Sequence, residues 1–228
     1  MSDNKVIFWD IDGTLLKSSL ENHLLLYLLR NKHITYTRIF LNLLHLSLRW
    51  PFPAWHQVKA AYLRGLTQEN VRSWVKDCWD TEIQPSLYLG SIQIIQNYHK
   101  DGFRQILLSG TLQILAAPLA QHLGFKHLIT GEAETNNGEY SGRLINPHPK
   151  GLHKVALAEK WLKDNQLTWE QTAAVGDHWA DRFLLERVSK AVVIRPGWRL
   201  KNLSRKKGWT IISDPESTQE FVNAFKKI

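Results

Sequence analysis

Cysteine is nearly absent from this chain of 228 residues, since Cys78 is the only one. A single cysteine excludes a disulfide within the chain and fits a reducing compartment. The N-terminal residues 1–5 are polar and lead directly into an apolar segment, so no signal peptide or transit peptide is expected. The default location that follows is the cytoplasm.

Long hydrophobic runs are also missing. Leu24–Leu29 is unbroken, and Ile39–Leu48 is interrupted only by Asn42, His45 and Ser47. Neither run reaches the roughly 20 residues that cross a bilayer, so a spanning helix is not expected. Two interpretations stay open: a buried helix pair, or apolar helices edged by arginine and lysine, with Trp50 and Trp55 near their ends, that contact a membrane surface.

The chain has no paired-cysteine metal motif, no glycine-rich phosphate loop and no interleaving of aromatic and basic residues. The formal net charge of +8 favours anionic partners such as phosphate esters or acidic lipids. We expect no nucleic-acid partner. A basic cluster is interpreted as a solvated helix face; it consists of Lys201, Arg205, Lys206 and Lys207.

The most informative feature present is the segment Asp10–Thr14, which contains two aspartates and a glycine directly after the apolar run Val6–Trp9. A buried strand that ends in this way directs carboxylates to the carboxyl edge of a sheet, where α/β proteins hold their chemistry. Taken alone, either aspartate could equally cap or turn the chain.

Three further polar groups follow strand-like or helical segments in a fixed order. Ser109-Gly110-Thr111 follows an apolar run, Lys154 begins a helical stretch, and Gly176–Asp181 follows another apolar run. On these motifs the chain resembles the haloacid dehalogenase (HAD) superfamily of phosphohydrolases, in the subfamily that includes phosphoserine phosphatases. The resemblance extends over nearly all of the chain, including the segments Tyr140–Arg143 and Arg195–Gly197.

The alternation of strand-like runs and helical patterns from about residue 84 predicts an α/β fold with a Rossmann-like, doubly wound parallel sheet. Asn137-Gly138 predicts a tight hairpin, which we interpret as structural. The expected strands are Val6–Trp9, Gln105–Leu108, His127–Thr130, Ala173–Gly176, Ala191–Ile194 and Trp209–Ile212.

Residues 17–83 interrupt this alternation and read as consecutive helices, with boundaries near residues 30–32, 50–53 and 65–67. The resemblance implies that they form an all-helical cap domain inserted after the first strand, which closes over the phosphate pocket and sets specificity. Residues 1–16 and 84–228 then form the catalytic core.

The resemblance also implies a mechanism. Asp10 would be the nucleophile that forms an aspartyl-phosphate, and Asp12 the general acid and base. Ser109, Gly110 and Lys154 would hold the phosphoryl oxygens. Lys150 is the rival for Lys154, which we prefer because Val155-Ala156-Leu157 continues the helix.

Mg²⁺ is the implied cofactor, because a carboxylate that attacks a phosphate dianion needs a cation between them. The implied ligands are Asp10, the backbone carbonyl of Asp12, and Asp177. Asp181 would bind through a metal-held water or orient Lys154. The histidines show no ligand spacing, and His178 is expected to line the pocket without a catalytic role.

The expected function is a Mg²⁺-dependent phosphomonoesterase that acts on a small phosphorylated metabolite. Phosphoserine phosphatases carry a glutamate where this chain has Ser19, and Glu21 could replace it only with a shift along the helix. An alternative substrate is a lipid phosphate, such as phosphatidylglycerol phosphate, reached by peripheral membrane contact through the cap. The alternative of another class is a non-catalytic membrane- or protein-binding module on the same fold.

Overall fold

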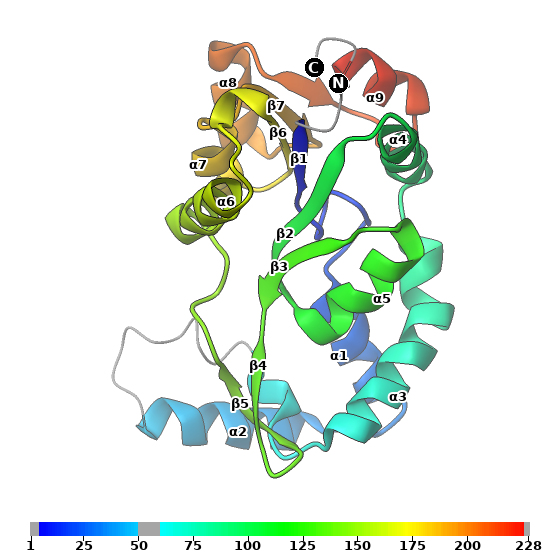
Figure 1. Cartoon of the computed structure of the whole chain (residues 1–228). Helices are drawn as coiled ribbons and strands as arrows, with labels where there is room; N and C mark the ends of the chain where they lie inside the picture. The colour runs from blue at the N-terminus through cyan, green and yellow to red at the C-terminus, as the bar shows by residue number, and fades with distance from the viewer. Residues whose placement is uncertain (1–4, 50–59, 226–228) are drawn as a thin grey trace.

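The computed structural model describes residues 5–49 and 60–225 (Figure 1). The helix boundary expected near residues 50–53, together with Trp50 and Trp55, lies outside the described residues. Among the described residues, no helix combines the length and the apolar character needed to span a bilayer.

Six parallel strands form the central sheet in the order β3-β2-β1-β6-β7-β8. The prediction of a doubly wound α/β sheet is therefore confirmed. β2 is longer than expected, because it continues through Ser109-Gly110-Thr111 to Leu112 with an irregular register. The strands are β1 (Val6–Trp9), β2 (Arg104–Leu112), β3 (His127–Gly131), β6 (Thr172–Gly176), β7 (Lys190–Ile194) and β8 (Thr210–Ile212).

Helices cover both faces of this sheet, which explains why its strands are apolar without alternation. In β1, Ile7 and Trp9 pack toward one face, whereas Val6 and Phe8 pack toward the other. Figure 1 shows α4, α5 and α9 on one side of the sheet and α6, α7 and α8 on the other. These helices are α4 (Leu89–Lys100), α5 (Gln113–Leu123), α6 (Leu152–Asp164), α7 (Arg182–Leu185), α8 (Trp198–Lys207) and α9 (Thr218–Phe225).

The described parts of the segment between β1 and α4 are mainly helical, as expected. It contains α1 (Leu20–Arg30), α2 (Tyr36–Arg49) and α3 (Gln68–Cys78), followed by a π-helical turn and a 3₁₀ turn up to Ser86. The Ser19 hydroxyl accepts a hydrogen bond from the Asn22 amide and so begins α1. The helix boundaries predicted near residues 30–32 and 65–67 are confirmed.

The two apolar runs of this segment differ in burial. Leu20, Leu24 and Leu28 of α1 are fully buried against α3 and the core. α2 instead exposes Tyr36, Phe40, Leu41 and Leu44, so the interpretation of a wholly buried helix pair is wrong for this face of α2.

A hairpin connects the core to the helical segment. It consists of β4 (Ala133–Asn136) and β5 (Glu139–Leu144), and its two-residue turn has φ angles of 51° at Asn137 and 84° at Gly138, as the Asn-Gly sequence predicts. The Gly65 amide donates to the Tyr140 carbonyl at 2.8 Å, and the Tyr140 amide donates to the Leu66 carbonyl at 2.9 Å. The hairpin thus fixes the helical segment to the core, and Figure 1 shows it reaching from β3 to α2.

Candidate active site

The predicted site residues follow neighbouring strands, and the sheet order brings them together. Asp10 directly follows β1, Ser109 lies near the end of β2, and Asp177 directly follows β6. Since β1 lies between β2 and β6 and all three are parallel, these side chains meet at one edge of the sheet. They line a cavity of about 370 Å³ together with Lys154 from the first turn of α6.

Lys154 is the centre of the polar cluster in this cavity. Its Nζ donates hydrogen bonds to Oδ1 of Asp10 and to Oδ1 of Asp181, each at 2.7 Å. Burial opposes its charge, but the two carboxylates outweigh burial and raise the pKa of Lys154. Lys150 lies exposed at the rim of the same cavity, so the geometry favours Lys154 over its rival.

Three carboxylates gather beside this lysine. Asp10, Asp177 and Asp181 each offer an oxygen, and these oxygens lie within 4.8 Å of one another. Oδ1 of Asp177 is buried and has no hydrogen-bond partner among the described residues. Burial, with Asp10 and Asp181 nearby, raises the pKa of Asp177 to about 8. An unpaired oxygen in a cluster of hard ligands fits an oxygen-binding cation such as Mg²⁺.

Gly13 allows Asp177 to lie this close to the first strand. Its φ is +77°, and a Cβ added there would lie 2.1 Å from Oδ2 of Asp177. Any side chain would therefore push the carboxylate aside. Gly13 belongs to the first motif, but its role becomes visible only in three dimensions.

Asp10 is buried and close to its partners. Burial raises the pKa of Asp10, the adjacent Lys154 ammonium lowers it, and the Asp181 carboxylate raises it further. The contact with Lys154 at 2.7 Å fixes one carboxylate oxygen. The Ser109 side chain forms a further hydrogen bond with this carboxylate, which also lowers its pKa.

Asp12 is held from two directions. Its Oδ1 accepts a hydrogen bond from the Leu20 amide at 2.9 Å, and its Oδ2 accepts one from the Thr111 hydroxyl at 2.9 Å. Burial, Glu21 and Asp10 raise the pKa of Asp12 to about 7. A carboxyl group that titrates near neutrality can both give and take a proton.

Ser109 and Gly110 lie at the same cavity, as expected. A Cβ on Gly110 would lie 1.6 Å from Cε1 of His148, so the imidazole occupies the space that a side chain would need. His148 also lines the cavity, although no sequence pattern selects it as a site residue. It lies in the loop between β5 and α6, where no periodic pattern marks it.

His178 and Asp181 form a short cap after β6. The His178 amide donates to Oδ2 of Asp181 at 3.1 Å, and Nδ1 of His178 accepts from the Ala180 amide at 3.1 Å. Asp181 thus receives hydrogen bonds from both Lys154 and the backbone, which fixes its orientation. His178 lines the cavity, as expected.

The described lining of this cavity contains no glutamate that could replace the one expected from phosphoserine phosphatases. Ser19 lines the cavity and begins α1. Glu21 is buried, and its Oε1 accepts a hydrogen bond from the Leu112 amide at the start of α5, 3.2 Å away. It is absent from the described lining of the cavity.

Comparisons with known proteins give the family. The model of the haloacid dehalogenase-like hydrolases matches residues 7–186. A phosphoserine phosphatase of Mycobacterium tuberculosis is 26% identical over 214 residues, which cover 90% of this chain and 69% of that protein. A histidinol-phosphatase of Neisseria meningitidis is 24% identical over 157 residues, which cover 67% of this chain and 71% of that protein.

Solved structures share the fold. A Bordetella pertussis protein of unknown function has a TM-score of 0.79 at 22% identity, with 91% of this chain and 97% of that chain covered. A phosphoserine phosphatase in its apo form has a TM-score of 0.67 at 18% identity, with 99% of both chains covered. The resemblance noted from the motifs is thereby confirmed, and the chain belongs to the haloacid dehalogenase-like hydrolase family.

Proposed function

We propose that this protein is a Mg²⁺-dependent phosphomonoesterase that works through an aspartyl-phosphate on Asp10. The observation that carries the proposal is the contact of the buried Lys154 with Asp10 and Asp181, beside an Asp177 oxygen that has no described partner. A binding module has no need for this combination of a fixed carboxylate, a buried cation and a carboxyl group that titrates near neutrality.

In the first step, the Asp10 carboxylate oxygen that does not contact Lys154 attacks phosphorus and the ester P–O bond breaks. Protonated Asp12 gives its proton to the departing oxygen, so the alcohol leaves neutral. Ser109, the Gly110 amide and Lys154 hold the phosphoryl oxygens as charge develops on them.

In the second step, Asp12, now ionised, takes a proton from a water molecule that attacks the phosphorus. The bond between phosphorus and the Asp10 oxygen breaks, and the products are inorganic phosphate and the original carboxylate. The pKa of about 7 for Asp12 suits this double role, because neither protonation state is costly near neutral pH.

Asp10, Asp177 and the backbone carbonyl of Asp12 would hold Mg²⁺, with Asp181 acting through a metal-held water or through Lys154. When bound, Mg²⁺ supplies positive charge between the nucleophile and the phosphate dianion. Gly13 keeps the Asp177 carboxylate in reach, and the glycine is therefore a positioning residue.

The proposed substrate class is a small phosphorylated metabolite. Two relatives are named for phosphate esters of small amino compounds, phosphoserine and histidinol phosphate. Phosphoserine itself is disfavoured, because Ser19 stands at the position of the expected glutamate and Glu21 is engaged with α5. Specificity is proposed to lie in the cap, residues 17–83, above a core of residues 1–16 and 84–228.

The second candidate is a lipid phosphate at a membrane surface, which the exposed face of α2 favours. Tyr36 is 75%, Phe40 64%, Leu41 55% and Leu44 43% exposed, although all four are large and apolar. Flotation with anionic vesicles at low salt tests it: the double variant Phe40→Glu/Leu44→Glu should lose binding. An unmodified protein that fails to float would argue against this candidate.

Hydrolysis of p-nitrophenyl phosphate tests the proposed function. We expect turnover with Mg²⁺, loss of turnover when the metal is chelated, and loss in Asp10→Asn with an unchanged thermal unfolding profile. Asp164→Asn is the matched control, because Asp164 is exposed at the end of α6 and does not belong to the described lining of the cavity, and it should retain activity. Undiminished activity in Asp10→Asn would reject the assignment.

A further inference from the structure

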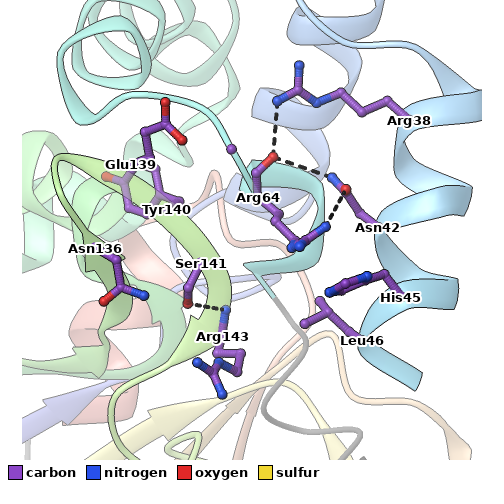
Figure 2. A pocket seen from close by; sticks show the side chains of 11 residues that line it. Arg38, Asn42, His45, Leu46, Arg64, Asn136, Glu139, Tyr140, Ser141 and Arg143 are labelled. Carbon is purple, nitrogen blue, oxygen red and sulfur yellow. Dashed lines mark hydrogen bonds between the residues drawn. The ribbon is translucent and has the colours of Figure 1, made fainter. Parts of the chain in front are cut away.

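A second cavity, of about 890 Å³, lies between α2, the turn at residues 60–66 and the hairpin β4–β5 (Figure 2). None of its described lining residues lines the catalytic cavity. Its described lining includes three arginines, Arg38, Arg64 and Arg143, and one acidic residue, Glu139. This excess of positive charge in a concave site has no role in the proposed mechanism.

Two of these arginines have no acidic partner within residues 5–49 and 60–225. Nη2 of Arg38 donates to the Arg64 carbonyl at 3.1 Å, and Nη1 of Arg64 lies 3.5 Å from Oδ1 of Asn42. No described carboxylate forms an ion pair with either guanidinium, whereas Arg143 pairs with Glu134 at 3.1 Å. Both arginines are half-buried, so water screens their charges less than it would at an open surface.

The frame that holds the two guanidinium groups is fixed before any ligand binds. Asn42 is buried, and its Nδ2 donates to the Ala61 carbonyl at 3.2 Å and to the Arg64 carbonyl at 3.4 Å. The hydrogen bonds of Tyr140 with the Gly65 amide and the Leu66 carbonyl link this frame to the hairpin. Binding a ligand here would therefore cost little ordering of the protein.

Glu139 does not neutralise the site. Its side chain is exposed, and Figure 2 shows its carboxylate directed away from the Arg64 guanidinium. The Ser141 hydroxyl, on the hairpin side of the cavity, accepts a hydrogen bond from the Arg143 amide at 3.2 Å and can still donate one. The described lining therefore offers several donors, and the acceptors that the two guanidinium groups contact, the Arg64 carbonyl and Oδ1 of Asn42, are neutral.

We propose that this cavity binds an oxyanion group, a phosphate or a carboxylate, through Arg38 and Arg64. A planar guanidinium matches both groups in charge and geometry. The group can belong to a separate small anion or to the distal end of the phosphorylated substrate. The second source rests on the proposed function, whereas the first is independent of it.

The first experiment titrates inorganic phosphate into metal-free protein by calorimetry, without turnover. We expect saturable binding that weakens about tenfold to hundredfold in Arg64→Gln and in Arg38→Gln, because each loses a hydrogen bond to a charged group. Arg72→Gln removes the same charge from an exposed cap position and should bind like the unaltered protein. Arg64→Lys keeps the charge and should recover part of the affinity.

The second experiment compares kcat/KM for phosphoglycerate and glycerol phosphate, two esters that differ by a carboxylate. If the substrate supplies the anion, the unaltered protein prefers the carboxylated ester at least about tenfold and Arg64→Gln loses that preference. If a separate anion binds, phosphate affinity falls in Arg64→Gln while the ester preference stays unchanged.

Thermal unfolding first checks that Arg38→Gln and Arg64→Gln fold like Arg72→Gln. The proposal is overturned if both variants then show the same phosphate affinity and the same ester preference as Arg72→Gln. If no variant hydrolyses either ester but phosphate binding still depends on Arg64, the proposed function fails and the anion site stands. The two claims can thus fail separately.

Discussion

Removal of the Lys154 ammonium group should destabilise the protein strongly at neutral pH. The lysine bridges two carboxylates at 2.7 Å, and its side chain is 4% exposed, with 11% for Asp10 and 8% for Asp181. Lys154→Met keeps most of the volume but leaves two buried carboxylates facing each other without a cation. Breaking a buried ion pair in this way costs about 3–5 kcal/mol.

The magnitude can be measured by urea and thermal unfolding of metal-free protein. A loss of that size corresponds to a fall in Tm of about 6–20 °C for a chain of this length. Lys150→Met, an exposed position four residues earlier, is the matched control and should change stability by less than about 0.5 kcal/mol.

The pH dependence adds a second criterion. Burial raises the pKa of Asp10, so this carboxyl group becomes protonated at a higher pH than an exposed one. The loss of stability in Lys154→Met should therefore be smaller at pH 5 than at pH 8. If Lys154→Met unfolds like Lys150→Met at pH 8, the inferred role of the lysine as the central cation of the cluster is refuted.

Other predictions concern the remaining parts of the site. Gly13→Ala should lower activity by about 10²-fold, because the methyl group displaces Asp177, and should lower stability by about 1–2 kcal/mol, because φ is positive. Steady-state kinetics measures the first effect and urea unfolding the second. Activity equal to that of the unaltered protein would contradict the positioning role of Gly13. The pKa of Asp177 is about 8 in the folded protein, against 3.8 in the unfolded chain, so the folded state binds more protons between these two pH values. The stability of the metal-free protein should therefore fall as pH rises from about 4 to about 8. Mg²⁺ competes with the same proton, so calorimetry should give tighter Mg²⁺ binding at pH 9 than at pH 6, and a pH-independent affinity would contradict the ligand role of Asp177. Thr111→Val should lower the rate without unfolding the protein, since it removes the hydroxyl that holds Asp12; an unchanged pH–rate profile would contradict this role.

Much of the fold follows from the sequence because parallel strands buried on both faces leave continuous apolar runs. β1 and β7 show this pattern clearly, and Asn137-Gly138 specifies its turn through two positive φ angles. The site follows for the same reason, since polar residues at the ends of neighbouring parallel strands must meet. The continuation of the helix through Val155-Ala156-Leu157 favoured Lys154 over Lys150, and the buried contact with Asp10 agrees with that choice.

The remainder depends on contacts that no local pattern encodes. Glu21 meets the Leu112 amide across 91 positions of sequence, and His148 meets Gly110 from an irregular loop. The burial of α2 could not be predicted either, because the sequence of an apolar helix does not indicate which of its faces other elements cover. In the structure Phe40 and Leu44 of α2 are exposed, whereas Leu24 and Leu28 of α1 are covered by the core.

Rapid acid quenching during turnover, followed by peptide mass analysis, tests the central claim most directly. With Mg²⁺ and a rapidly cleaved phosphate ester, the peptide that carries Asp10 should gain the mass of one phosphoryl group, and the gain should vanish in Asp10→Asn. Turnover with no phosphorylated peptide, or with the phosphoryl group on another residue such as Ser109 or His178, would contradict nucleophilic attack by Asp10.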